Sequence, residues 1–176
     1  MREDFLHFIW QFQHFDKNAL ATTQQQSLSI LDTGKRNADA GADFQMAKVI
    51  MDGVAWAGSV EIHLKSSDWN HHQHQQDPSY NNVVLHVVWQ DDRPIQRADQ
   101  SYLPTLELKD RVDMHWLYRY QSLMHNLSPI PCASQWNQVN DLKKITMLDR
   151  SLVQRLQDKA FLVRALLIKN QYDWEE

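Results

Sequence analysis

The spacing of apolar side chains predicts a helix at the start of the chain and a strand after it. Phenylalanine and isoleucine recur at steps of three and four residues over 4–15, which predicts a helix with one apolar face, capped by Asp4. Residues 27–31 alternate between apolar and polar side chains and predict a short strand that ends in the turn-forming sequence 32–34. The polar segment 35–41 predicts a loop.

A β-hairpin is predicted next. Residues 44–51 are rich in apolar and β-branched side chains, and they are followed by Asp52-Gly53, a dipeptide favoured in tight hairpin turns. Residues 54–66 would form the return strand, in which Gly58 indicates a bulge or the close approach of another segment.

The second half predicts one more strand and then helices. Residues 67–82 are polar and rich in histidine, which predicts a loop or a short helix. Residues 83–89 are apolar at almost every position, which is typical of a central strand buried on both faces, and a turn-rich connection follows over 91–104. Helical spacing of apolar side chains predicts helices over 114–125 and about 141–170.

This order of elements predicts the fold class and a division of the chain. A helix, three to four strands, a short helical link, another strand and then helices indicate a mixed α/β fold with an α+β mixed sheet. We expect an α/β core over residues 1–110 and a helical extension over 111–176. Because the last helical pattern runs almost to the final residue, the extension is expected to begin a longer carboxy-terminal region.

Charge and composition narrow the classes of partner. The chain has 176 residues, of which 43% are hydrophobic, and a formal net charge of −4, so it lacks the basic excess of a dedicated nucleic-acid binder. Local patches matter more than the sum, so a nucleic-acid partner stays open. Basic residues outnumber acidic ones in the last predicted helix, which we interpret as a solvated face rather than an arm toward a phosphate backbone.

The cysteine count and the amino terminus indicate a cytoplasmic protein. Cys132 is the single cysteine, so no disulfide can form within the chain, which fits a reducing compartment. The amino terminus lacks a signal-peptide pattern, and the sequence has no run of about 18 apolar residues, so no membrane partner is expected. Four glycines are too few for most glycine-rich phosphate loops.

The predicted hairpin carries the first candidate site. In a strand over 58–65, side chains alternate between faces, so Glu61, His63 and Lys65 share one face. Asp43 lies at the start of the neighbouring strand, and the hairpin would bring it close to Glu61. Two converging carboxylates form an oxygen site suited to Mg²⁺ or Mn²⁺, which can activate water for phosphodiester cleavage. The alternative is a solvated face on which Glu61 and Lys65 simply pair.

A histidine cluster forms the second candidate site. His71, His72 and His74 occupy three of four consecutive positions, and imidazoles at short spacing can hold a transition metal. Zinc is less expected than Mg²⁺ or Mn²⁺ because no thiolate is nearby. The alternative is a polar surface segment with incidental histidines. His86 interrupts an apolar strand; it is either a satisfied core histidine or, if it shares the face of Glu61, a further member of the site.

Several sequence segments resemble those of a known protein family. They are GADF, WAGSVEIHLKSSDWNHHQHQQDPSYNNVVLHVV, an early WQF, LSILDTGKRNADAGADF and YLPTLEL, and together they resemble the uncharacterised bacterial family called domain of unknown function 2851. The resemblance covers nearly the whole chain and brings no established activity. Members of that family are longer, which implies that this chain is the amino-terminal part.

A more distant resemblance implies a chemistry. An Asp at a strand start, a hairpin and a Glu on the next strand are similar to the PD-(D/E)XK nuclease pattern, whose core runs helix, three strands, helix, strand. The pattern implies that Asp43 and Glu61 are the metal-binding carboxylates. His63 stands where that pattern has its lysine, so Lys65 would have to substitute for it.

The segment that contains the histidines also resembles a sequence segment found in one group of nucleases. A Trp followed by histidines, here Trp69 and the cluster after it, is similar to the very-short-patch repair endonucleases, in which a histidine serves as the base. That resemblance implies a catalytic role for His71 or His72.

Three hypotheses follow: a metal-dependent nuclease that acts on nucleic acid, a non-catalytic binding module on a nuclease-like scaffold, and a histidine-cluster transition-metal protein. For the first, the candidate catalytic residues are Asp43, Glu61, His63, Lys65, His71 and His72, and the candidate metal ligands are Asp43, Glu61 and His74.

Overall fold

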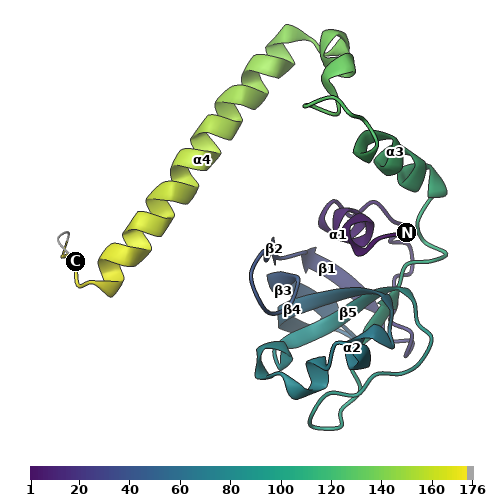
Figure 1. Ribbon diagram of the computed structural model, residues 1–176. Helices are drawn as coiled ribbons and strands as arrows, with labels where there is room; N and C mark the ends of the chain where they lie inside the picture. The colour runs from purple at the N-terminus through teal and green to yellow at the C-terminus, as the bar shows by residue number, and fades with distance from the viewer. Residues whose placement is uncertain (174–176) are drawn as a thin grey trace. The chain divides into compact units, whose positions relative to one another are not determined.

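A computed structural model describes residues 1–173 of the chain (Figure 1). The chain forms two compact units, Met1–Ser122 and a second that runs from Leu123 onward. The first unit contains the sheet, and the second contains the 29-residue helix α4 (Asp141–Lys169). The predicted helix over 141–170 is therefore confirmed. The proposed domain boundary at residue 110 stays a prediction.

A mixed sheet forms the centre of the first unit (Figure 1). Its first three strands are antiparallel neighbours, and the last three are parallel neighbours, so one strand has an antiparallel partner on one side and a parallel partner on the other. In spatial order the strands are β1 (Leu28–Asp32), β3 (Phe44–Met51), β4 (Val54–Lys65), β5 (Val83–Gln90) and β6 (Thr105–Glu107), and the two-residue β2 (Lys35–Arg36) pairs with β3.

The four longer strands confirm the sequence-based predictions to within one residue at each end. The strand expected to be central, β5, is hydrogen-bonded on both sides and buried over six of its eight residues. Two short strands were not predicted: β2 lies in the segment 35–41, expected to be a loop, and β6 follows the turn-rich connection. Both are only two or three residues long and depend on partners distant in sequence, so their own pattern carries little signal.

Gly53 and Gly58 in the hairpin have the roles that the sequence predicted, a tight turn and a close approach. Asp52 and Gly53 both have positive φ, 47° and 79°, as the tight turn between β3 and β4 requires. Gly58 lies where the segment that leads into β5 approaches β4 closely. A Cβ atom at this position would lie 2.5 Å from the carbonyl oxygen of Asn82 and 2.5 Å from Cγ1 of Val84.

Helix α1 (Glu3–Gln11) presents its apolar face to the sheet. Leu6, Ile9 and Trp10 are fully buried in the main core. The predicted cap at Asp4 is wrong, because Arg2 occupies the N-cap position. Asp4 lies in the first turn, where its negative charge interacts favourably with the positive end of the helix dipole. The helix is also shorter than predicted.

Helix α3 (Met114–Met124) confirms the helix predicted over 114–125. Its buried Leu117 joins the main core, and the Tyr120 ring packs against Phe5 and Phe8 of α1. None of the helices in the described part of the chain is long and apolar enough to cross a membrane.

A helical link between β4 and β5 covers a second, smaller core. It consists of α2 (Asp68–His71) and two short 3-10 helices, η1 (His74–Gln76) and η2 (Pro78–Tyr80), as the prediction of a loop or short helix allowed. Trp69 of α2 is buried in this core with Val83 of β5, which holds the link against the sheet.

Replacing Gly58 tests the close approach to β4. Because a methyl group would overlap the Asn82 carbonyl, we expect Gly58→Ala to lower the free energy of unfolding by about 1–3 kcal/mol. Urea denaturation followed by tryptophan fluorescence measures this, since Trp10 and Trp69 are buried in the same unit. The control is Ala57→Ser on the exposed neighbouring position, which should change stability by less than about 0.5 kcal/mol. Equal effects of the two changes would contradict the assignment.

Candidate functional site

The pairing of β3 with β4 brings the two candidate carboxylates together. Phe44 pairs with Val60, so Asp43 and Glu61 lie next to this pair at one end of the hairpin. The Asp43 backbone N–H donates to Glu61 Oε2 at 3.1 Å, and the Ile62 N–H donates to Asp43 Oδ2 at 2.9 Å. Each carboxylate thus accepts a hydrogen bond from the other strand, which fixes both side by side.

Alternation along β4 separates the site from the main core. Val60 and Ile62 pack into that core, while Glu61 and His63 occupy the other face, where they are 5% and 2% exposed. His86 on β5 is aligned with Glu61 and is fully buried, and its Nε2 lies 2.9 Å from Nδ1 of His63. His86 therefore belongs to the site, the second of the two alternatives that its sequence context left open.

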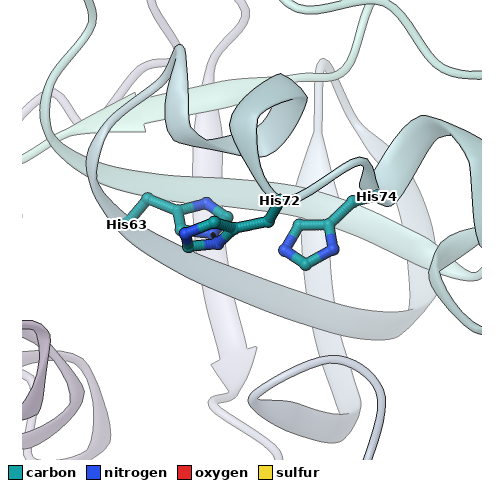
Figure 2. A group of neighbouring side chains, drawn as sticks. All are labelled: His63, His72 and His74. Atoms are coloured by element: carbon teal, nitrogen blue, oxygen red, sulfur yellow. Dashed lines mark hydrogen bonds between the residues drawn. The ribbon is translucent and has the colours of Figure 1, made fainter.

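The helical link supplies two further imidazoles. His72 Nδ1 lies 3.1 Å from His63 Nε2, and His74 Nε2 lies 3.2 Å from Glu61 Oε1. Gln73, between these histidines, has a left-handed backbone with φ 60°, which reverses the chain and lets both neighbours face the sheet. Figure 2 shows the three imidazoles of His63, His72 and His74 gathered in one place.

Two of the candidate residues lie apart from this cluster. Lys65 is exposed at the end of β4, and no hydrogen bond or ion pair joins its side chain to the cluster in the described part of the chain. The His71 side chain is 67% exposed and lies 3.4 Å from Asp68 on its own helix. The structure therefore brings together Asp43, Glu61, His63, His72 and His74, but not Lys65 or His71.

Helix α1 contributes two residues that the sequence analysis missed. His7 Nε2 lies 3.2 Å from Asp43 Oδ2, and the His7 side chain is only 12% exposed. Glu3 precedes His7 by one helical turn, and its pKa is raised, mainly by burial, while the charges of His72 and Asp43 also act on it. The available signal was their i, i+4 spacing, which places both side chains on one face of the helix.

Burial shifts the ionisation of the groups at the centre of the site. The pKa of Glu61 is raised, first by burial and then by the neighbouring Asp43 charge, against the lowering effect of His74. Burial lowers the pKa of His63 to about 2 and that of His86 to about 3, and neighbouring imidazoles add to both shifts. At neutral pH these two imidazoles are therefore neutral, the form in which an imidazole can bind a metal.

The arrangement offers two kinds of ligand side by side. Asp43 and Glu61 provide carboxylate oxygens, which hard cations such as Mg²⁺ and Mn²⁺ prefer. His63, His72 and His74 each offer an imidazole nitrogen, and one such atom from each lies within 4.8 Å of the others. Glu61 lies between both groups, since Oε2 accepts from Asp43 and Oε1 faces His74.

Comparison with known proteins identifies the family. The family described as a protein of unknown function (DUF2851) matches residues 3–176, and the chain belongs to this family. The family resemblance seen in the sequence is thereby confirmed. No match is found among curated proteins or among solved structures.

The buried neutral histidines predict how stability depends on pH. In the unfolded chain they take up protons as the pH falls below about 6.5, whereas in the folded chain they stay neutral, so falling pH favours unfolding. The raised pKa of Glu61 acts in the opposite direction above pH 4.5. We expect His86→Leu to reduce the slope of unfolding free energy against pH by up to about 1.4 kcal/mol per pH unit.

Urea denaturation between pH 7 and pH 4.5, with a chelator present, measures this slope. The control is His115→Gln on the exposed side of α3, which removes a histidine without touching the cluster. If the slopes of both variants matched that of the wild type, the assignment of His86 as a buried neutral group would be wrong.

Proposed function

We propose that this member of the family is a divalent-metal-dependent hydrolase that cleaves phosphodiester bonds in nucleic acid. The observation that carries the proposal is the pairing of Asp43 with Glu61 at the end of the β3–β4 hairpin. The order of the first unit supports it: apart from the two-residue β2, the elements α1, β1, β3, β4, α2 and β5 follow the helix, three strands, helix and strand of the PD-(D/E)XK core.

The donor set fits a hard divalent cation. Both carboxylates are held by backbone N–H groups, and the Asp43 side chain keeps 26% of its surface exposed, so its oxygens can be reached from solvent. When bound, such a cation would engage phosphate oxygens and lower the pKa of a water molecule. The proposed ligands are Asp43 and Glu61.

The neighbouring residues would hold the carboxylates in place. His72 is the exposed histidine of the cluster and lies against His63, which shares one face of β4 with Glu61. His7 lies against the Asp43 carboxylate and acts as a positioning residue. Lys65, which would replace the lysine of the nuclease pattern, is exposed and apart from these groups, so we assign it no direct contact with the phosphate.

The experiment that tests the proposal is a cleavage assay. The full chain is incubated with single- and double-stranded DNA and RNA oligonucleotides, with Mn²⁺ or Mg²⁺ and with a chelator. We expect metal-dependent cleavage that Asp43→Asn or Glu61→Gln reduces by at least about 100-fold, the usual result of removing one strong electrostatic contact from a reaction centre. Calorimetry of Mn²⁺ binding should show a parallel loss of affinity in both variants.

Two controls separate the site from general effects of charge. Asp39→Asn removes an exposed carboxylate four residues before Asp43, and Lys65→Ala removes the exposed lysine of β4. Both variants should keep cleavage within a few-fold of the wild type. If the wild type bound Mn²⁺ but cleaved none of the four substrates, the catalytic proposal would fail and a non-catalytic binding module would replace it.

A further inference from the structure

Three imidazoles converge on one point beside Glu61, although they come from separate segments. His63 lies on β4, and His72 and His74 come from the helical link (Figure 2). We propose that His63, His72 and His74, with Glu61 Oε1 as a fourth ligand, form a transition-metal site of the zinc class. The site adjoins the oxygen site of Asp43, and its existence does not depend on phosphodiester cleavage.

The distances between the four ligand atoms fit such a site. Bonds from zinc to imidazole nitrogen or carboxylate oxygen are about 2.0–2.2 Å, so tetrahedral ligands lie about 3.3–3.6 Å from one another. The measured separations are 3.1 Å from His63 Nε2 to His72 Nδ1, 3.2 Å from His74 Nε2 to Glu61 Oε1 and 3.5 Å from His63 Nε2 to Glu61 Oε1. Three of the six separations are therefore close to tetrahedral edges, and the three imidazole nitrogens all lie within 4.8 Å of one another.

The orientation of His74 is independent support. Its side chain is 9% exposed, and its Nε2, although 3.2 Å from Glu61 Oε1, has no hydrogen-bond partner in the described part of the chain. A buried imidazole nitrogen without a partner is uncommon in folded proteins. A metal ligand, however, points at the ion and not at the neighbouring ligand. Two ligand atoms can therefore lie close together, as His74 Nε2 and Glu61 Oε1 do, without the alignment of a hydrogen bond.

A chain of hydrogen-bonded histidines is the competing explanation, and it covers only part of the cluster. It accounts for the contacts of 2.9 Å from His86 to His63 and 3.1 Å from His63 to His72. It does not include His74, whose Nε2 faces Glu61 Oε1 at 3.2 Å and not another imidazole. A shared ion accounts for all three imidazoles and for Glu61.

Surrounding groups hold the rings in place, as is usual around metal ligands. With its Nε2 directed at the ion, His63 would donate its Nδ1–H to Nε2 of the fully buried His86. The His74 ring stacks on Tyr80 with centroids 3.7 Å apart and meets Trp69 edge-on at 5.3 Å. Neither ring can turn away without losing these contacts.

The ligand set selects the class of metal. Three imidazoles and one carboxylate suit Zn²⁺, Co²⁺, Ni²⁺ or Cu²⁺, whereas Mg²⁺ and Ca²⁺ prefer oxygen ligands throughout. From the sequence, zinc is less expected than Mg²⁺ or Mn²⁺ because no thiolate is near. A set of three nitrogens and one oxygen needs no thiolate, so we now expect the zinc class at this position.

Cobalt titration of the full chain tests the site without relying on activity. Metal-free protein is titrated with Co²⁺, and the visible absorption reports both the number of ions and their geometry. We expect one Co²⁺ per chain with the intense absorption of a tetrahedral ion, displaced by Zn²⁺ but not by excess Mg²⁺. His74→Ala and His72→Ala should each weaken binding by more than about 100-fold, beyond the loss that a supporting outer residue causes.

The neighbouring histidine provides the matched control. His71→Ala removes an exposed imidazole next to His72 in the sequence and should leave Co²⁺ affinity and spectrum unchanged. His72 is itself exposed, so its replacement tests the site with little risk to folding. The proposal would be overturned if His71→Ala and His72→Ala lost Co²⁺ affinity equally, or if His72→Ala lost none. The weak absorption of an octahedral ion in the wild type would also overturn it.

Asp43→Asn separates this inference from the proposed function. The variant should lose cleavage activity yet keep the tetrahedral Co²⁺ spectrum, because Asp43 is not one of the four proposed ligands. A wild type that binds Co²⁺ in this way but cleaves no substrate would refute the nuclease proposal alone. A wild type that cleaves with Mn²⁺ but lacks the tetrahedral Co²⁺ spectrum would refute the histidine site alone.

Discussion

The burial of Glu61 is the constraint on which the rest of the site depends. A carboxylate that is 5% exposed must be satisfied by hydrogen bonds, ions or protonation, because burying an unpaired charge costs many kilocalories per mole. One oxygen accepts the backbone N–H of Asp43, and the other faces two imidazoles. The strand register, the position of β5 and the path of the helical link all serve to place partners around this group.

Three local features of the backbone make that arrangement possible. Gly58 allows the segment before β5 to approach β4, and the parallel pairing that follows aligns His86 with Glu61. The left-handed Gln73 then turns the link so that His72 and His74 both face the sheet. An anion and four imidazoles are thus collected without a long loop, because each element contributes only one or two residues. Such a compact polar group inside a sheet protein is costly unless its members satisfy one another's hydrogen bonds and charges.

The sequence predicted the four longer strands, the hairpin and the neighbouring carboxylates, because each follows from a local rule. The rules failed where distant segments decide the outcome. Alternation placed Lys65 with Glu61, but Lys65 is the last residue of β4, and there its side chain is exposed. Ideal helical spacing would have paired His71 with His74, whereas the turn at Gln73 pairs His72 with His74. His7 was not predicted because the apolar pattern of α1 does not show which distant residue its other face meets, here Asp43.

The position of Glu61 also means that the two proposed metal sites would not exclude each other. Its two oxygens point to different neighbours, Oε2 to the Asp43 backbone and Oε1 to His74, so one carboxylate can serve both. A zinc-class ion held by imidazoles would neutralise the buried charge and leave Asp43, with 26% of its side chain exposed, as the group that solvent and substrate can reach. On this view the histidines stabilise the carboxylate and the carboxylates provide the chemistry.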